Sequence, residues 1–180
     1  MSETASEKKR RIFIKECCAI GIGGVVGAAP LIAGLTVLLD PLTKKGGQGI
    51  KVKIASLESL PEDGIPIKLS IIATRADAWN KYPEAPIGAV YIRRTGPQKV
   101  EALNAVCPHA GCFVDYRSAL GGYFCPCHNS TFSLDGKIAN PKSPSPRPMD
   151  SLEVEVINGN EVWVNFQNFY AGREKKVVQT

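Results

Sequence analysis

The chain has 180 residues, of which 44% are hydrophobic and 22% are charged, and its formal net charge is +5 at pH 7. This length suggests one domain of ordinary size and an additional segment. Outside the N-terminus the basic residues form no block and are not interleaved with aromatic residues, so the sequence indicates no nucleic-acid partner.

An uncharged segment runs from Cys17 to Leu39 and reads CCAIGIGGVVGAAPLIAGLTVLL. As a helix it would be about 34 Å long, enough to cross a hydrocarbon core of about 30 Å. A cleaved signal peptide is the alternative, but its apolar region is only about 7–15 residues long, and Pro30 makes a poor cleavage context. The segment therefore predicts a single uncleaved transmembrane helix over residues 17–39.

Five basic residues precede this segment within KKRRIFIK, residues 8–15. By the positive-inside rule they predict that residues 1–16 are cytoplasmic. The order RRIFIK resembles a bacterial twin-arginine export signal, with a generic positive flank as the alternative. Both interpretations place residues 40–180 on the far side of the membrane. The export signal implies that this membrane is a bacterial inner (cytoplasmic) membrane, with these residues on the periplasmic, extracytoplasmic side.

The segment DPLTKKGGQG, residues 40–49, follows the apolar run. Pro41 is expected to end the helix, and the three glycines are expected to prevent a new one from starting. A segment of this composition behaves as a flexible chain. Residues 40–49 are therefore predicted to form a flexible tether.

Beyond residue 50 the signals are those of short strands. The runs rich in β-branched and alternating apolar residues are IKVKIASL (50–57), IPIKLSIIA (65–73), GAVYIRR (88–94), VEALNAV (100–106) and LEVEVINGNEVWVNF (152–166). The last run contains Asn158-Gly159-Asn160, a hairpin signal. No stretch in this part has a helical period over more than two turns, so its predicted fold class is mainly β and antiparallel.

Both histidines lie beside cysteines, in two short boxes. The first box is CPHAGC, residues 107–112, and the second is CPCH, residues 125–128. A mixed set of cysteines and histidines suggests zinc or an iron–sulfur cluster. The remaining cysteines, Cys17 and Cys18, open the apolar segment and are expected to behave as small apolar residues.

Zinc would be satisfied by two cysteines and two histidines in a tetrahedral site. Paired zinc ligands are, however, usually separated by about two to four residues. Only one residue separates Cys107 from His109, and a zinc site would leave two box cysteines unexplained. A zinc-stabilised, membrane-anchored binding module stays open as an alternative of a different class.

An iron–sulfur cluster would use one thiolate and one imidazole from each box. Two thiolates on one iron and two imidazoles on the other form the Rieske 2Fe–2S arrangement. The ligands would be Cys107, His109, Cys125 and His128. Cys112 and Cys127 would then be free to bond to each other, and disulfides persist outside the cytoplasm.

With the upstream anchor and the proline-rich segment NPKSPSPRPMD, residues 140–150, the two boxes resemble those of Rieske iron–sulfur subunits of cytochrome bc/b6f-type quinol oxidoreductases. The resemblance covers the whole plan of the chain. It implies a Rieske-type antiparallel β domain over residues 50–180, with a cluster-binding subdomain at about residues 105–150, after the single N-terminal transmembrane helix. The proline segment would cover the cluster.

The resemblance also implies roles for individual residues. Cys107 and Cys125 would hold the inner iron of the 2Fe–2S cluster, and His109 and His128 the exposed outer iron. It further implies a disulfide between Cys112 and Cys127. His128, and after it His109, would contact the quinol and accept its proton.

Two residues that follow His128, Ser130 and Phe132, bear on the potential of the cluster, and a third, Asn129, bears on the shape of its loop. Ser130 matches a serine that donates to a bridging sulfide, whereas Phe132 replaces a tyrosine that donates to a ligand sulfur in many high-potential relatives. A lost hydrogen bond of about 0.5–1.5 kcal/mol lowers a one-electron potential by roughly 20–65 mV. The sequence therefore predicts a lower-potential centre suited to menaquinol. Asn129 stands where glycine is common, and asparagine tolerates left-handed φ.

The implied function is that of an electron-transfer subunit. It would take an electron and a proton from quinol, preferably menaquinol, and pass the electron to a c-type cytochrome within a complex that contains a cytochrome b-type membrane subunit. The small Rieske subunit of an arsenite-oxidase-like molybdoenzyme is the nearest alternative, and the proline segment favours the bc-type interpretation. The C-terminal QNFYAGREKKVVQT, residues 167–180, has no role that the sequence indicates.

Overall fold

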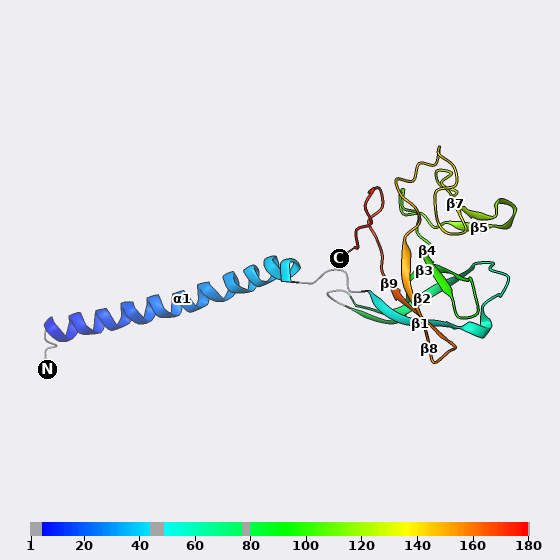
Figure 1. Cartoon of the computed structure of the whole chain (residues 1–180). Helices are drawn as coiled ribbons and strands as arrows, with labels where there is room; N and C mark the ends of the chain where they lie inside the picture. Colours follow the sequence, from blue (N-terminus) through cyan, green and yellow to red (C-terminus); the bar gives the residue numbers. More distant parts are fainter. Residues whose placement is uncertain (1–4, 44–48, 77–79, 180) are drawn as a thin grey trace. The chain divides into compact units, whose positions relative to one another are not determined.

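The computed structural model describes residues 5–43, 49–76 and 80–179 of the chain. These form two compact units, Met1–Lys45 and Gly46–Thr180. The first unit contains one helix and the second contains all of the strands (Figure 1).

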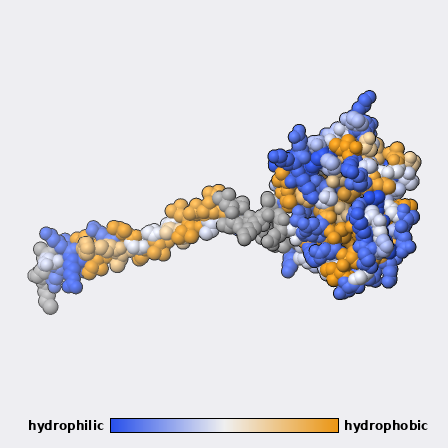
Figure 2. All heavy atoms as spheres, viewed as in Figure 1, coloured by the Kyte–Doolittle hydropathy of each residue, from blue (hydrophilic) through white to orange (hydrophobic). Residues whose placement is uncertain are grey.

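The helix α1 extends from Ala5 to Thr43 and is long and apolar enough to cross a membrane. Its N-terminal end is hydrophilic and its following surface is apolar (Figure 2). The large apolar side chains between Ile20 and Leu39 are exposed. A helix that is apolar on all sides is stable where lipid or protein covers it, which agrees with the predicted transmembrane segment.

The expectation that Pro41 ends the helix is wrong, because α1 continues to Thr43. Proline removes one N–H donor and the hydrogen bond that it would make. Near a helix end this loss is tolerated, because the terminal turn already contains unsatisfied backbone groups. Residues 44–48, the centre of the predicted tether, lie outside the described residues.

A six-stranded antiparallel sheet forms the base of the second unit. Its strands are β1 (Ile50–Ser56), β2 (Ile67–Ala76), β3 (Lys81–Arg94), β4 (Val100–Asn104), β8 (Ser151–Ile157) and β9 (Glu161–Phe166). Their order is β1-β9-β8-β4-β3-β2. The edge strands β1 and β2 also contact each other, so the sheet curls toward a barrel. A short 3-10 helix, η1 (Leu57–Ser59), follows β1.

Each predicted run corresponds to a strand or, in the last case, to the hairpin β8–β9. The turn of that hairpin has positive φ at Asn158 (53°) and Gly159 (73°), as the predicted Asn-Gly signal requires. The strand β3 begins well before the predicted start at residue 88, because the sequence YPEAP did not indicate a strand. Register shifts in its pairing with β2 accommodate this proline-containing part.

A second antiparallel sheet of three short strands is built around the second sequence box. It contains β5 (Asp115–Arg117), β6 (Gly122–Phe124) and β7 (Thr131–Ser133), with the 3-10 helix η2 (Ser118–Leu120) after β5. The sequence did not predict these strands, because three residues are too few to show an alternating period. The first box precedes β5, and the second box connects β6 to β7.

Two hydrophobic cores lie on opposite faces of β3 and β4. Along β3, Val90 and Ile92 belong to the core enclosed by the large sheet, whereas Ala89 and Tyr91 belong to the second core. Successive side chains of a strand point to opposite faces, which explains this division. The second core also contains Cys107 and Cys125, so both boxes rest on the outer face of the large sheet.

Candidate metal centre

The first loop, residues 107–112, has a closed backbone pattern. The Cys107 N–H donates to the Cys112 carbonyl at 2.7 Å, and the Gly111 N–H donates to the Cys107 carbonyl at 3.0 Å. Gly111 has a φ of 82°, a conformation that glycine adopts without strain. These bonds fix the loop in a shape that is independent of its side chains.

The second loop, residues 125–130, repeats this pattern at equivalent positions. The Cys125 N–H donates to the Ser130 carbonyl at 2.8 Å, and the Asn129 N–H donates to the Cys125 carbonyl at 3.0 Å. Asn129 has a φ of 59°, which confirms that it takes the left-handed place of a glycine. The two boxes therefore form matched loops.

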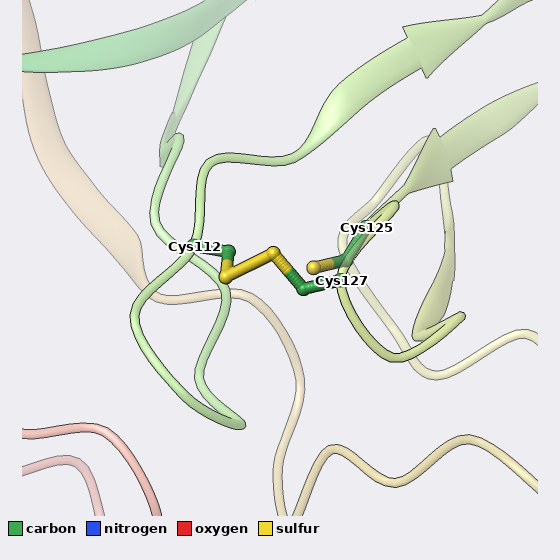
Figure 3. A group of neighbouring side chains, drawn as sticks. All are labelled: Cys112, Cys125 and Cys127. Atoms are coloured by element: carbon green, nitrogen blue, oxygen red, sulfur yellow. A yellow bond between two sulfur atoms is a disulfide. The ribbon is translucent and has the colours of Figure 1, made fainter.

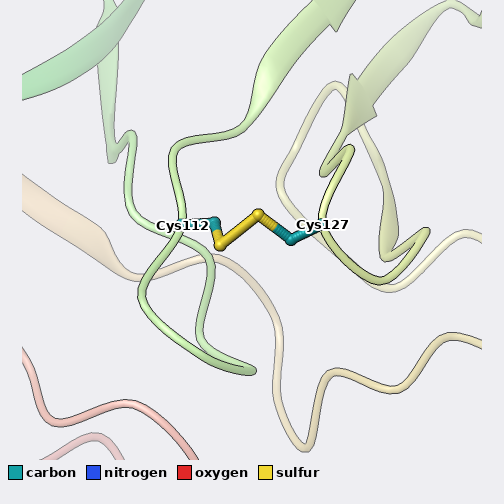
Figure 4. Close-up of a disulfide and its surroundings, with 2 residues drawn as sticks. All are labelled: Cys112 and Cys127. Carbon is teal, nitrogen blue, oxygen red and sulfur yellow. A yellow bond between two sulfur atoms is a disulfide. The ribbon is translucent and has the colours of Figure 1, made fainter.

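A disulfide between Cys112 and Cys127 joins the two loops (Figure 4). The Cα atoms of these residues are 6.7 Å apart, and the bridge encloses a sequence separation of 15 residues. This confirms the predicted pairing. Since Cys112 ends the first loop and Cys127 lies in the middle of the second, the bridge limits how far the loops can separate.

The other two box cysteines are free, buried and adjacent. Cys107 and Cys125 are each 1% exposed. Burial raises the pKa of the Cys107 thiol, while the backbone of His109 and the Ser130 hydroxyl oppose the rise, and neighbouring Cys125 raises it further. Two thiolates this close and this buried repel each other, so they need a cation between them.

The Cys125 sulfur also lies beside the disulfide, and the sulfur atoms of Cys112, Cys125 and Cys127 are within 4.8 Å of one another (Figure 3). Metal ligation requires thiolates, and two of these three sulfurs are already bonded to each other. Within the Rieske-type loops, the free thiols that could serve as thiolate donors are therefore those of Cys107 and Cys125.

The two imidazoles form a second adjacent pair. The ring centroids of His109 and His128 are 4.7 Å apart, and the ring planes are at 89° to each other. His128 is exposed and His109 is half-buried. Nδ1 of His109 is buried and has no hydrogen-bond partner in the described part of the chain. A buried ring nitrogen without a hydrogen bond costs folding free energy unless it binds a metal. Nδ1 of His109 is therefore suited to metal ligation.

Ser130 is fully buried, and its Oγ likewise has no hydrogen-bond partner among the described residues. The hydroxyl lies close enough to lower the pKa of the Cys107 thiol. A free donor beside a thiolate fits a hydrogen bond to a sulfur of the cluster, as the sequence predicts. The donor set of two thiols, two imidazoles and one hydroxyl thus fits a 2Fe–2S cluster.

Phe132 lies in β7 and is 1% exposed within the second core, beside Tyr123 and Cys125. Its ring offers no hydrogen-bond donor to the neighbouring cysteine. Met149, at the end of the proline segment, packs in the same core as Cys107. The segment over residues 140–150 therefore contacts the hydrophobic core beneath the loops through Met149. The proline pattern in the sequence did not indicate this contact.

Comparison with known proteins assigns the family. Residues 52–158 match the Rieske [2Fe-2S] domain. The chain belongs to this family. A Rieske 2Fe–2S cluster is therefore its cofactor, and the zinc alternative finds no support. The paired Cys–His loops described above lie within the matched residues.

Relatives of this Rieske protein resemble it over most of its length. The menaquinol:cytochrome c reductase iron-sulfur subunit of Bacillus subtilis (strain 168) is 30% identical over 142 residues, which cover 77% of this chain and 81% of the relative. The subunit of the same name from Geobacillus thermodenitrificans is 29% identical over 162 residues, 88% of this chain and 92% of the relative. The crystal structure of a cyanobacterial plasma membrane Rieske protein from Synechocystis PCC 6803 is 24% identical, covers 64% of this chain and 99% of that one, and has a TM-score of 0.45.

Proposed function

We propose that this chain is the electron-transfer subunit of a menaquinol:cytochrome c oxidoreductase of the bc type. The observation that carries the proposal is the similarity, over 77% and 88% of this chain, to two subunits named menaquinol:cytochrome c reductase iron-sulfur subunit. The subunit oxidises quinol only as part of a complex. The arsenite-oxidase-like alternative finds no support in the comparisons.

The proposed ligands divide by burial. The buried thiolates of Cys107 and Cys125 would hold one iron of the cluster, and the imidazoles of His109 and His128 would hold the other. When bound, the cluster accepts one electron at a potential of about −150 to +300 mV, the range of Rieske centres. With Nδ1 of His109 as the buried nitrogen, Nε2 is the ring nitrogen left for an external partner.

His128 is the first candidate for contact with quinol, because it is the more exposed imidazole. Its Nε2 accepts a hydrogen bond from the quinol hydroxyl and then holds the proton. His109 is the second candidate. The disulfide and the closed backbone of both loops keep the imidazoles in place during this contact, which reduces the reorganisation that proton transfer requires.

We further propose that α1 anchors the chain in a bacterial cytoplasmic membrane, with residues 1–16 in the cytoplasm. The Rieske domain then lies on the extracytoplasmic side, where the Cys112–Cys127 disulfide persists. Its partners are a cytochrome b-type membrane subunit, which provides the quinol site, and a c-type cytochrome. A tether between the end of α1 at Thr43 and the start of β1 at Ile50 would allow the domain to visit both, and the twin-arginine motif would serve as its export signal.

Quinol-dependent reduction tests this function. Membranes that contain the chain and its complex are expected to reduce both the Rieske centre and a c-type cytochrome after addition of a menaquinol analogue. Low-temperature EPR and visible absorbance measure the two steps. If dithionite produces the reduced Rieske signal but neither menaquinol nor ubiquinol does, the chain does not oxidise quinol.

The substitution Phe132→Tyr is expected to raise the midpoint potential by roughly 20–65 mV, because the new hydroxyl can donate to a ligand sulfur and stabilise the added electron. EPR-monitored redox titration measures the shift. Phe166→Tyr adds the same hydroxyl to the other core and should leave the potential unchanged. An unchanged or lower potential in Phe132→Tyr would contradict the inference that the missing hydroxyl lowers the potential.

A further inference from the structure

The C-terminal segment folds into a hairpin over residues 168–179, here named the C-terminal hairpin. Phe169 pairs with Val178 in an antiparallel bridge, and the Tyr170 N–H donates to the Val177 carbonyl at 2.9 Å. Phe169 is buried in the core of the large sheet, and Val178 packs against that core. The base of the hairpin is therefore fixed on the domain, so its tip, residues 171–176, has a defined position.

The tip of the hairpin contacts the first loop. The Gly172 N–H donates to the Pro108 carbonyl at 2.8 Å. Gly172 has a φ of 73°, and a Cβ at this position would lie 3.7 Å from the His109 carbonyl oxygen. Pro108 separates the proposed ligands Cys107 and His109, so this bond holds the peptide that joins them. Among the described residues, no such backbone hydrogen bond reaches the equivalent Pro126 carbonyl in the second loop.

Arg147 joins the proline segment to this tip. Its side chain is 6% exposed and is paired with Asp150, to which Nε and Nη2 donate at 2.9 and 2.7 Å. Its Nη1 donates to the Arg173 carbonyl at 2.5 Å and Nη2 to the Tyr170 carbonyl at 3.1 Å. The planar fork of arginine suits this arrangement, whereas the single ammonium of lysine cannot reproduce it.

Asn104 forms hydrogen bonds to the proline segment, to the residue before the C-terminal hairpin and to the segment that leads into the first loop. It is buried at the end of β4, where its backbone N–H donates to the Asp150 carbonyl at 2.8 Å. Its side-chain Nδ2 donates to the Gln167 carbonyl at 2.8 Å, and its Oδ1 accepts the Val106 N–H at 3.0 Å. One buried residue, through its backbone and its side chain, thus connects the approach to the first loop, the proline segment and the residue that precedes the C-terminal hairpin.

We propose that the C-terminal hairpin is a clamp that holds the first loop in place and that Arg147 is the positioning residue that locks it. The hairpin acts on the first loop through the Gly172–Pro108 bond, and Arg147 holds the hairpin tip against the proline segment. The second loop depends instead on the disulfide and its own backbone bonds. The proposal concerns the proposed ligands Cys107 and His109, and so rests on their assignment under the proposed function.

Hydrogen exchange followed by mass spectrometry tests the clamp in the full-length, cluster-loaded chain. The variants are Arg147→Lys, which keeps the charge beside Asp150, and a truncation after Tyr170, which removes the Gly172 donor and leaves the Arg147–Asp150 pair. In both, amide exchange in residues 107–112 is expected to rise about tenfold, because local opening becomes easier. Exchange in residues 125–130 should stay within about twofold of the unmodified chain.

Arg94→Lys is the matched control. Arg94 also donates to one carboxylate, that of Glu62 at 2.8 Å, and to the carbonyls of Gly96 and Pro97 at 3.3 and 3.0 Å. It should leave exchange in both loops unchanged. The EPR lines of the reduced cluster should broaden in Arg147→Lys, where the ligand positions become less uniform, and should keep their width in Arg94→Lys.

Equal acceleration of both loops would overturn the proposal, because it would indicate general destabilisation. Unchanged exchange in residues 107–112 after truncation would also overturn it, because the hairpin would then cover the loop without holding it. The exchange measurement requires no quinol. A chain whose first loop responds as expected but which menaquinol does not reduce would contradict the proposed function and support the clamp.

Discussion

Replacement of Cys107 by serine is expected to abolish the 2Fe–2S cluster. The Cys107 thiol is buried and adjacent to that of Cys125, and it is one of two free cysteines in the Rieske domain. A serine hydroxyl at this position stays protonated and is a poor ligand for iron compared with a thiolate. Iron and acid-labile sulfide, about two of each per loaded chain, should fall to near zero, and the EPR signal should disappear.

Cys17→Ser is the matched control, because Cys17 is also a free cysteine but lies in α1, outside the Rieske domain. This variant should retain full iron and sulfide. Circular dichroism should show that Cys107→Ser keeps its β structure, since the core enclosed by the large sheet does not include Cys107. A Cys107→Ser variant with the full content of iron and sulfide would show that the ligand assignment is wrong.

Loss of the disulfide has the next largest expected effect. The double substitution Cys112→Ser with Cys127→Ser should lower the free energy of unfolding by about 3 kcal/mol, the value for a closed loop of about 15 residues. The bridge has this sequence separation and joins the two loops. Denaturant unfolding of the full-length chain measures the change, and reductant should bring the unmodified chain to the stability of the variant.

The same variant should lose its cluster faster than the unmodified chain, because its loops are then joined through the cluster alone. Serine at both Cys17 and Cys18 provides a control with the same number of substitutions, since both are free cysteines. Unfolding at an unchanged denaturant concentration, together with unchanged cluster retention, would mean that the bridge contributes nothing to holding the loops.

The strands that the sequence predicted are those with several alternating residues or a specific turn signal. The hairpin β8–β9 had both, and the Asn158-Gly159 turn has the positive φ values that this signal implies. The strands β5–β7 have three residues each and depend on pairing partners that are not visible in a local pattern. The end of α1 was misplaced, because a proline in the last turn was treated as a stop.

The candidate site was predictable because its chemistry is carried by rare side chains at particular spacings. The sequence indicated which cysteines pair, and the structure places the free thiols together and the imidazoles together. The C-terminal hairpin could not be predicted, because its contact with the first loop is a backbone bond from Gly172 that leaves no side-chain signature. Arg147 within the proline segment was the available signal, since an arginine beside prolines and Asp150 needs a partner when it is buried.

The most direct test of the account is an EPR-monitored redox titration of the membrane-bound protein at several pH values. A rhombic Rieske-type signal is expected, with a midpoint in the lower part of the range of about −150 to +300 mV. The midpoint should fall as pH rises if, as proposed, electron uptake by the cluster is accompanied by proton uptake at the site. A high midpoint would contradict menaquinol as the substrate, and a metal-replete protein without any paramagnetic signal on reduction would contradict the cluster itself.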